Sequence, residues 1–275
     1  MLINEKTAIT SSRVLLVPYS KHHVPRYHEW MQDAKPQEIQ QATASEPLSL
    51  PEEYAMQSSW RTDADKLTFI ICVPLAVSAP SLAERVITNI NTTTSSTTST
   101  PITLEDPNVD APAAMLGDVN LFLRVDEDDG DEDVGEGDGE GSTKAVVVGE
   151  IELMIAEKGN QGKGYGRAGL LCFLKYVADN EGGIVRGFMA SLSSSSSFSS
   201  SAAGGDRLGY LVAKIGAENT RSLALFESVG FQRISEKPNV FGEVELRREM
   251  VRGEEGGELL GRFGVEGYRE VGYER

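Results

Sequence analysis

Short apolar stretches with strand-like spacing run through the first two thirds of the chain. In residues 144–156 the apolar side chains alternate with Glu150 and Glu152, so the two kinds occupy opposite sides of an extended segment. Other strands are expected over residues 13–18, 67–73 and 115–125. Helices are expected over residues 24–32 and from a capping box at Ser49 and Glu52 to about residue 60.

Helical and extended patterns alternate in the remainder of the chain. A helix follows the long strand, because Leu170, Phe173 and Leu174 recur at the spacing of one helical face. Another helix is expected between Asn219, a favoured N-cap residue, and Gly230. Strands are expected over residues 210–215, 231–236 and 240–250. The predicted order is βααβββαβαββ, a mixed α/β arrangement.

Three low-complexity stretches have compositions that cannot supply a core: residues 92–100, 126–141 and 191–201. We expect disordered insertions over about residues 76–112, 126–143 and 187–207. Loop-closure entropy grows slowly with length, so such insertions can extend from one compact domain. The expected organisation is one domain over residues 1–250, followed by a polar C-terminal tail over residues 251–275.

The second of these stretches also carries most of the charge. Leaving out its ten carboxylates changes the formal net charge from −16 to −6. A chain without a strongly basic face is not expected to bind nucleic acid. No apolar run approaches the roughly 18 residues of a membrane span, so no membrane partner is expected. Two cysteines are too few for a disulfide framework, which favours a reducing, cytoplasmic location.

Residues 161–166 form a Gly-rich turn between the long strand and its helix. Such a turn lets a ligand approach the backbone, and a helix start offers unpaired N–H groups, so the place can bind a phosphate. A P-loop is excluded because Lys163 is followed by Gly164 rather than Ser or Thr. The dinucleotide fingerprint G-x-G-x-x-G is matched literally from Gly164 to Gly169, but the acidic residue expected about 20 positions later is absent.

A third interpretation covers more of the chain. Gln161, Gly164 and Gly166 have the spacing Q-x-x-G-x-G, and N-x-x-S-x-x-L-F-E-x-x-G-F follows from Asn219 to Phe231. In this order, the two motifs resemble those of the GCN5-related N-acetyltransferase superfamily. Within that superfamily, further segments resemble the eukaryotic N-acetyltransferase 9 proteins: residues 17–19, 23–31, 43–48, 53–57, 117–123 and 149–157.

The resemblance implies a fold, a cofactor and a set of binding residues. The fold would be α/β (α+β), with a mixed, mostly antiparallel sheet flanked by helices and low-complexity loop insertions. Acetyl-CoA would be the co-substrate, and no metal is expected. Main-chain groups of Met154 and Ala156 would meet its reacting carbonyl, and Asn219 and Ser222 would flank its pantetheine arm. Its pyrophosphate would be held by Gln161, Gly162, Lys163, Gly164, Tyr165 and Gly166.

Transfer of acetyl to an amine needs a base, because amines titrate near 8 (α-amino) or 10.4 (lysine) and are protonated at neutral pH. Glu150 and Glu152 share a strand face with Met154 and are the candidates. The alternative is that both are solvated or paired carboxylates on a sheet face. Family members place a tyrosine acid on the second helix, but the matching residue here is Phe226. Proton return would then fall to water or another tyrosine.

Histidines and cysteines offer two further kinds of chemistry. His22, His23 and His28 are close in sequence, but without a fourth ligand or a nearby cysteine we expect surface histidines rather than a metal site. Cys172 has no visible histidine partner, so a covalent acetyl-cysteine route is disfavoured. Direct transfer in a ternary complex is expected instead.

The leading hypothesis is acetyl-CoA-dependent transfer of acetyl to a protein amine. The resemblance implies a protein N-terminus as acceptor, with tubulin a candidate partner, and places Tyr27 and Glu46 at the acceptor groove. One alternative is a small-molecule amine acetyltransferase on the same fold. Another is a non-catalytic, acetyl-CoA-binding scaffold on microtubules, which the missing helix tyrosine keeps open.

Overall fold

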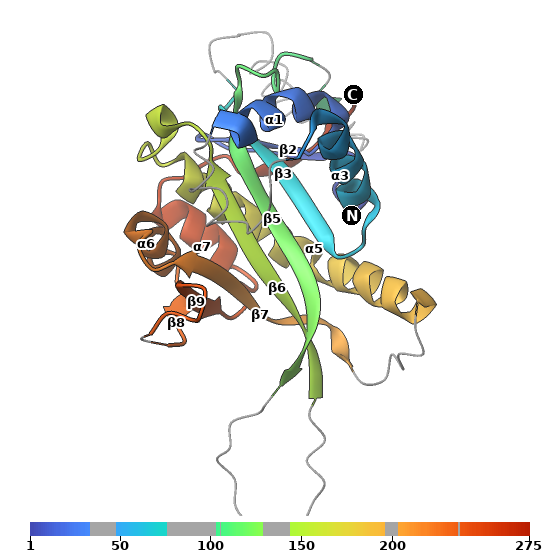
Figure 1. Cartoon of the computed structure of the whole chain (residues 1–275), viewed down its shortest axis with the longest axis vertical. Helices are drawn as coiled ribbons and strands as arrows, with labels where there is room; N and C mark the ends of the chain where they lie inside the picture. Colours follow the sequence, from blue (N-terminus) through green and yellow to red (C-terminus); the bar gives the residue numbers. More distant parts are fainter. Residues whose placement is uncertain (34–47, 76–102, 105, 129–143, 196–202, 236) are drawn as a thin grey trace, which may run out of the picture.

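The computed structural model describes residues 1–33, 48–75, 103, 104, 106–128, 144–195, 203–235 and 237–275. In these ranges ten strands form one sheet in the order β4-β10-β1-β2-β3-β5-β6-β7-β9-β8 (Figure 1). The strands are β1 (Thr7–Thr10), β2 (Leu15–Pro18), β3 (Lys66–Cys72), β4 (Thr103–Leu104), β5 (Met115–Asp128), β6 (Lys144–Ile155), β7 (Ala203–Gly216), β8 (Gln232–Arg233), β9 (Glu243–Arg248) and β10 (Arg269–Tyr273). Neighbours are antiparallel except β10 with β4 and β6 with β7. The predicted mixed, mostly antiparallel sheet is confirmed.

Helices cover both faces of this sheet. Over the described ranges they are α1 (Val24–Asp33), α3 (Leu50–Thr62), α5 (Tyr165–Ser195), α6 (Thr220–Ser228) and α7 (Glu255–Arg262). Tyr27 and Trp30 of α1 share a buried cluster with Ile70 of β3 on one face. On the other face, the rings of Phe173 and Tyr176 on α5 meet Phe69 edge-on. Figure 1 shows α1 and α3 in front of the sheet and α5 behind it.

Local capping signals explain where several helices begin and end. Ser49 and Glu52 form the predicted capping box at α3, with the Ser49 N–H donating to Glu52 Oε2 at 2.8 Å. Asn219 caps α6, because its Oδ1 accepts from the Ser222 N–H at 3.1 Å. Gly230 has φ +97° and stops that helix, as its position predicts.

Regular structure extends further into the low-complexity segments than their composition predicts. α5 continues to Ser195 and β7 begins at Ala203, so much of residues 187–207 is helix or strand. β5 likewise continues to Asp128, inside the acidic run. The helix continues because its buried face extends beyond the apolar residues that predicted it: Phe188 is only 4% exposed. Part of the first expected insertion, residues 76–112, is also ordered: β4 covers Thr103–Leu104, and Asp110 is fully buried. The rest of the three expected insertions lies outside the described residues.

The C-terminal segment is not the polar tail that its composition indicates. α7 packs against α5, and β10 enters the sheet between β4 and β1. Val251, Leu260 and Val265 are buried there. Glycine and glutamate separate these apolar residues, so they show no helical or strand period in the sequence. β1, which pairs with β10, also lies outside the predicted strands.

The sheet opens between the parallel strands β6 and β7. The β6–β7 pairing ends at Glu150 opposite Val212, although β6 continues to Ile155 and β7 to Gly216. On its other side β6 stays paired with β5 as far as Ile155 opposite Gly117. Among the described strands, none therefore pairs with one edge of β6 at its end, and α5 begins ten residues after Ile155, at Tyr165.

Candidate active site

Main-chain groups of β6 face the gap between β6 and β7. The Ala156 N–H donates to the Leu116 carbonyl at 3.0 Å, which turns Ala156 toward β5. Main-chain groups alternate in direction along an antiparallel strand, so Met154 also faces β5 while Leu153 and Ile155 face the gap. This corrects the expectation that Met154 and Ala156 offer main-chain groups to a cofactor.

Gln161 joins the glycine turn to this strand edge. Its Nε2 donates to the Ile155 carbonyl at 2.9 Å, and its Oε1 accepts from Arg221 on α6 at 3.1 Å. Gly162 and Gly164 have φ of +76° and +90°, which only glycine adopts at little cost. The turn therefore leads directly into the start of α5, where the first N–H groups have no partner within the helix.

Three basic side chains surround the turn. Lys163 lies in it, and Arg221 comes from α6. Arg167 follows the turn in α5, but its guanidinium lies over an aromatic ring of the C-terminal segment. Arg13 comes from the β1–β2 loop: its guanidinium donates to the Lys163 carbonyl at 3.1 Å. A Cβ on Gly164 would lie 2.9 Å from that guanidinium. A helix start with this charge fits an anionic pyrophosphate.

The remaining predicted cofactor residues lie beside the same turn. Gly166 brings the first turn of α5 against β6 and α6, because a Cβ there would meet Leu153, Ile155 and Leu225 at 3.4–3.6 Å. Asn219 is exposed and caps the start of α6, where its side chain accepts from the N–H of the half-buried Ser222. Tyr165 is half-buried and packs on the main core. The structure thus brings the turn, the strand edge and α6 together.

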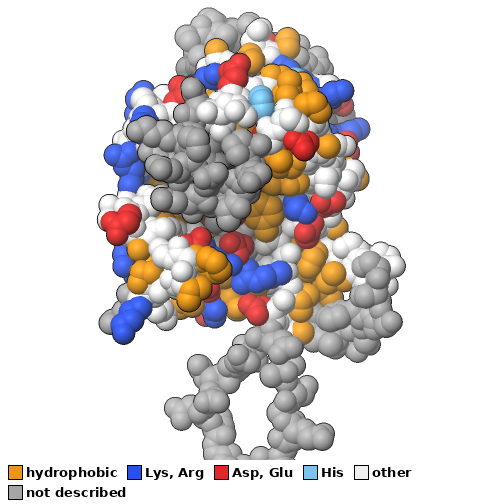
Figure 2. Space-filling view, viewed as in Figure 1, with side chains coloured by type: hydrophobic (Ala, Val, Ile, Leu, Met, Phe, Trp, Pro, Cys, Tyr) orange, Lys and Arg blue, Asp and Glu red, His pale blue; other side chains and the backbone are white. Residues whose placement is uncertain are grey.

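The two candidate bases differ in their surroundings. Glu150 Oε2 accepts from Arg124 at 3.0 Å and from Lys214 at 2.8 Å, so its charge is compensated. Glu152 forms no such ion pair with any described residue; desolvation, with the nearby Asp118 and Glu150 carboxylates, raises its pKa to about 7. Its side chain remains accessible to solvent. Over β6 and β7, Figure 2 shows acidic and basic side chains next to each other on this face.

A buried polar group under α1 adjoins Glu152. Asp118 lies on β5 opposite Met154 and is 2% exposed. Its Oδ2 accepts from Asn120 Nδ2 at 2.8 Å and from the Tyr27 hydroxyl at 3.4 Å. Burial raises the pKa of Asp118 to about 6 and that of Tyr27 well above 10. Tyr27, predicted as an acceptor residue, is therefore a neutral donor to a buried carboxyl.

Other predicted residues take different places. Phe226 is 3% exposed and packs edge-on against Phe231, so it is a core residue. Cys172 is fully buried, and burial raises the pKa of its thiol, which makes it a poor nucleophile. Glu46 lies outside the described residues.

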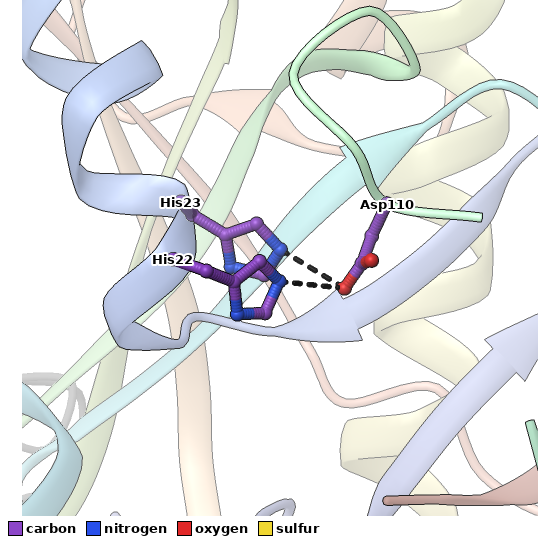
Figure 3. A group of neighbouring side chains, drawn as sticks. All are labelled: His22, His23 and Asp110. Atoms are coloured by element: carbon purple, nitrogen blue, oxygen red, sulfur yellow. Dashed lines mark hydrogen bonds and ion pairs between the residues drawn. The ribbon is translucent and has the colours of Figure 1, made fainter. Parts of the chain in front are cut away.

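Two of the three histidines meet a buried carboxylate (Figure 3). His22 and His23 Nε2 lie 2.9 and 3.1 Å from Asp110 Oδ2. His23 is fully buried, which corrects the expectation of surface histidines. Its Nδ1 accepts from the Ser20 N–H at 3.0 Å, so its Nε2 carries the hydrogen and donates to Asp110. A metal ligand needs a lone pair at that nitrogen, so this tautomer does not fit a metal ion.

Comparison with known proteins places this architecture in a family. A family model described as "Acetyltransferase (GNAT) domain" matches residues 13–232. The chain belongs to this family of acetyltransferases, as the two motifs predict.

Individual relatives are similar over most of the chain. An "N-acetyltransferase 9-like protein" of Schizosaccharomyces pombe is 35% identical over 254 residues, which cover 90% of this chain and 97% of that protein. The human "Alpha/beta-tubulin-N-acetyltransferase 9" is 34% identical, with 90% and 85% covered. A Bacillus anthracis GNAT acetyltransferase structure aligns at TM-score 0.46 and 12% identity, covering 88% of this chain and 98% of that one.

None of the described helices is long and apolar enough to cross a membrane.

Proposed function

We propose that this protein transfers the acetyl group of acetyl-CoA to a protein amine, by direct transfer in a ternary complex. An N-terminal α-amino group is the favoured acceptor, with tubulin the candidate protein. The observation that carries the proposal is the gap between β6 and β7. There the free edge of β6, the basic glycine turn and the Glu152 carboxyl border one place.

Each part of this gap has a task. The turn and the N-terminus of α5 would bind the pyrophosphate, with Arg13 and Lys163 adding charge. The main-chain groups of Leu153, which face the gap, would align the pantetheine arm and stabilise negative charge on the reacting carbonyl oxygen. The bound co-substrate supplies an activated thioester. Because α6 lies against Gly166, it would close the other side of the arm.

Glu152 would remove the proton that blocks attack. With a pKa near 7, its carboxylate can accept a proton from an ammonium group, directly or through one water, and leave a neutral amine. The amine nitrogen then bonds to the acetyl carbon as the carbon–sulfur bond breaks. The nitrogen releases its second proton to solvent, and the thiolate takes up a proton from solvent. Cys172 is too deeply buried to carry the acetyl group, which supports direct transfer.

The acceptor class is supported by the relatives. Proteins of human, Drosophila melanogaster and mouse at 32–34% identity are named as acting on α- and β-tubulin. A protein acceptor of that kind would place the enzyme in the cytoplasm. The two free buried cysteines agree with a reducing compartment.

Calorimetry with acetyl-CoA, followed by mass spectrometry of tubulin and of peptide libraries, tests the proposal. We expect acetyl-CoA to bind and the acetyl group to appear on an α-amino nitrogen. Gly164→Glu should abolish binding, since it puts a side chain and a negative charge into a positive-φ turn. Gly187→Glu is the matched control, because a side chain there meets open space on the same helix. Acetylation of small amines alone would contradict the protein acceptor.

A non-catalytic, acetyl-CoA-binding scaffold is the second candidate. Phe226 favours it, because this buried ring offers no hydroxyl at the position where many family members place an acid. The same experiment separates the two: binding of acetyl-CoA without any acetylated product would support the scaffold. Failure of acetyl-CoA to bind would contradict both.

A further inference from the structure

Asp118 is a buried carboxyl without a cationic partner among the described residues. The groups that donate to it, Asn120 and Tyr27, are both neutral. Its second oxygen, Oδ1, has no hydrogen-bond partner in the described part of the chain. An uncompensated charge in such a place costs free energy, so the site favours either a proton or an approaching cation.

Strand register places this carboxyl beside Glu152. Asp118 lies opposite Met154, and the next pair on the same face is Asn120 opposite Glu152. Cross-strand diagonal neighbours of this kind are about 7–8 Å apart between Cα atoms, within reach of long side chains. Asn120 therefore stands between the carboxyls, donating to one of them and facing the other across the strands.

The charged groups around the two carboxyls are mostly acidic. Glu150 of β6 and Glu243 of β9 act on Glu152 with the same sign as Asp118. Lys214 of β7 has the opposite sign, but its ammonium donates to Glu150 at 2.8 Å. On the helix side of the sheet, Tyr19 and Glu53 act on Tyr27 with the same sign as Asp118, and each raises the pKa of the Tyr27 hydroxyl. Two carboxyls close together in such surroundings cannot both ionise freely.

We propose that Asp118 is a positioning residue: it forms a carboxyl pair with Glu152, and thereby sets the pH at which Glu152 takes the proton of the acceptor amine. In the free protein the charge on each carboxyl opposes ionisation of the other, so the two titrate as a coupled pair. An acceptor ammonium at Glu152 supplies the cation that the pair lacks. Its N–H bond then breaks as an O–H bond forms on Glu152, and the amine is left neutral. The catalytic role of Glu152 rests on the proposed function, whereas the coupling of the carboxyls does not.

Carboxyl titration by NMR tests the pair without relying on activity. With 13C-labelled Asp and Glu, the midpoint of Glu152 in Asp118→Asn should fall by about one pH unit, because a like charge is removed. Tyr27→Phe should move it in the same direction by less, since loss of the hydroxyl favours the protonated form of Asp118. Glu258→Gln removes a carboxylate on α7, across the sheet, and should leave the midpoint unchanged.

Activity provides the second measurement. Glu152 must be ionised to act as a base, so the rate rises with pH through its midpoint. In Asp118→Asn the acidic limb of the kcat profile should move to lower pH by the same shift as the NMR midpoint. A merely structural role for Asp118 would lower kcat at every pH without moving the limb.

The outcomes separate this inference from the proposed function. An unchanged Glu152 midpoint in both Asp118→Asn and Tyr27→Phe would overturn the carboxyl pair, whatever the enzyme acetylates. A shifted midpoint in a protein that acetylates nothing would leave the pair standing and overturn the function. If Asp118→Asn does not fold, Tyr27→Phe alone decides, because it keeps the aromatic ring between Tyr19 and Trp30.

Discussion

Arg13 is a single exposed side chain whose loss should weaken cofactor binding. Its guanidinium donates to the Lys163 carbonyl and lies against Gly164, so it adds a positive charge where a phosphate would bind. We expect Arg13→Ala to raise the Kd for acetyl-CoA roughly fivefold at low salt, with a smaller effect at high salt because ions screen exposed charges. Calorimetry at two salt concentrations measures this.

The control for Arg13 is a basic residue far from the turn. Arg207 is exposed near the other end of β7, so Arg207→Ala removes the same charge without changing the site. Equal effects of the two substitutions would show that only net charge matters. An effect confined to Arg13→Ala would place the phosphates beside the β1–β2 loop.

Glu150 and Glu152 should respond differently to loss of charge. Glu152→Gln removes the proposed base and should lower kcat by about a hundredfold near neutral pH, with loss of the acidic limb of the pH profile. Glu150→Gln leaves Arg124 and Lys214 without their shared carboxylate, so it should alter stability and KM but keep that limb. If the limb disappears with Glu150 and survives in Glu152→Gln, the assignment of the base is wrong.

Residues close in sequence could be assigned from the sequence, and residues brought together by folding could not. Gln161 and Gly164 form one turn, so their spacing alone predicted a phosphate site. Arg13 reaches that turn from 150 positions away. Asp118 and Tyr27 are 91 positions apart, and their hydrogen bond depends on how α1 covers β5. Even Met154 was misplaced, because the direction of its main-chain groups depends on strand pairing.

The glycine turn is the element whose backbone conformation matters most. Gly162 has φ +76° and open space around its missing side chain, so Gly162→Ala introduces backbone strain alone. We expect a loss of about 1 kcal/mol in stability, with weaker acetyl-CoA binding as the turn relaxes. Thermal unfolding with and without acetyl-CoA measures both.

Gly159 offers the matched comparison. It lies three residues earlier, in the short 3-10 helix Lys158–Asn160 that precedes the turn, also has open space, and has no positive φ. Gly159→Ala should therefore leave stability and binding almost unchanged. Equal losses in the two variants would mean that the positive φ at Gly162 is not needed for the site.

Elements with a regular period were predicted, and elements held mainly by long-range pairing were not. β6 and α5 were found because apolar residues recur along them. β10 exists because β1 and β4 lie on its two sides, and its five residues carry no alternation that a sequence could show. α7 was hidden by a composition rich in glycine and glutamate, although Leu260 is buried against the core.

At the scale of the whole molecule, Asp110 connects two segments that are distant from it in the sequence. It accepts from His22 and His23 before α1, and from Tyr273 on β10 at 2.5 Å. Arg275 lies 2.7 Å from its other oxygen. Burial opposes its ionisation, but these donors hold the pKa of Asp110 well below its usual range. The network thus attaches the last strand to the start of the helix that covers Asp118.

This network should make stability depend on pH through His23. Burial lowers the pKa of His23 to about 4, whereas an unfolded histidine titrates near 6.5. The unfolded state therefore binds more protons between these values, and the free energy of unfolding should fall by about 3 kcal/mol as the pH drops from 6.5 to 4. In His23→Gln the new side chain can still donate to Asp110 but cannot gain a proton, so most of this pH-dependent loss of stability should be absent. Urea unfolding at the two pH values measures it.

Comparing variants isolates this effect from other titrating groups. The raised pKa values of Asp118 and Glu152 act with the opposite sign, since their contribution to stability is lost as the pH rises through about 6 to 7. Both proteins carry those carboxyls, so the difference between wild type and His23→Gln removes their effect.

Tyr273→Phe loses one hydrogen bond to Asp110 but no group that titrates between pH 4 and 6.5, so it should destabilise the protein equally at both values. If His23→Gln also destabilises the protein equally at both pH values, then His23 gains a proton in the folded protein as readily as in the unfolded one. The assigned tautomer would then be wrong.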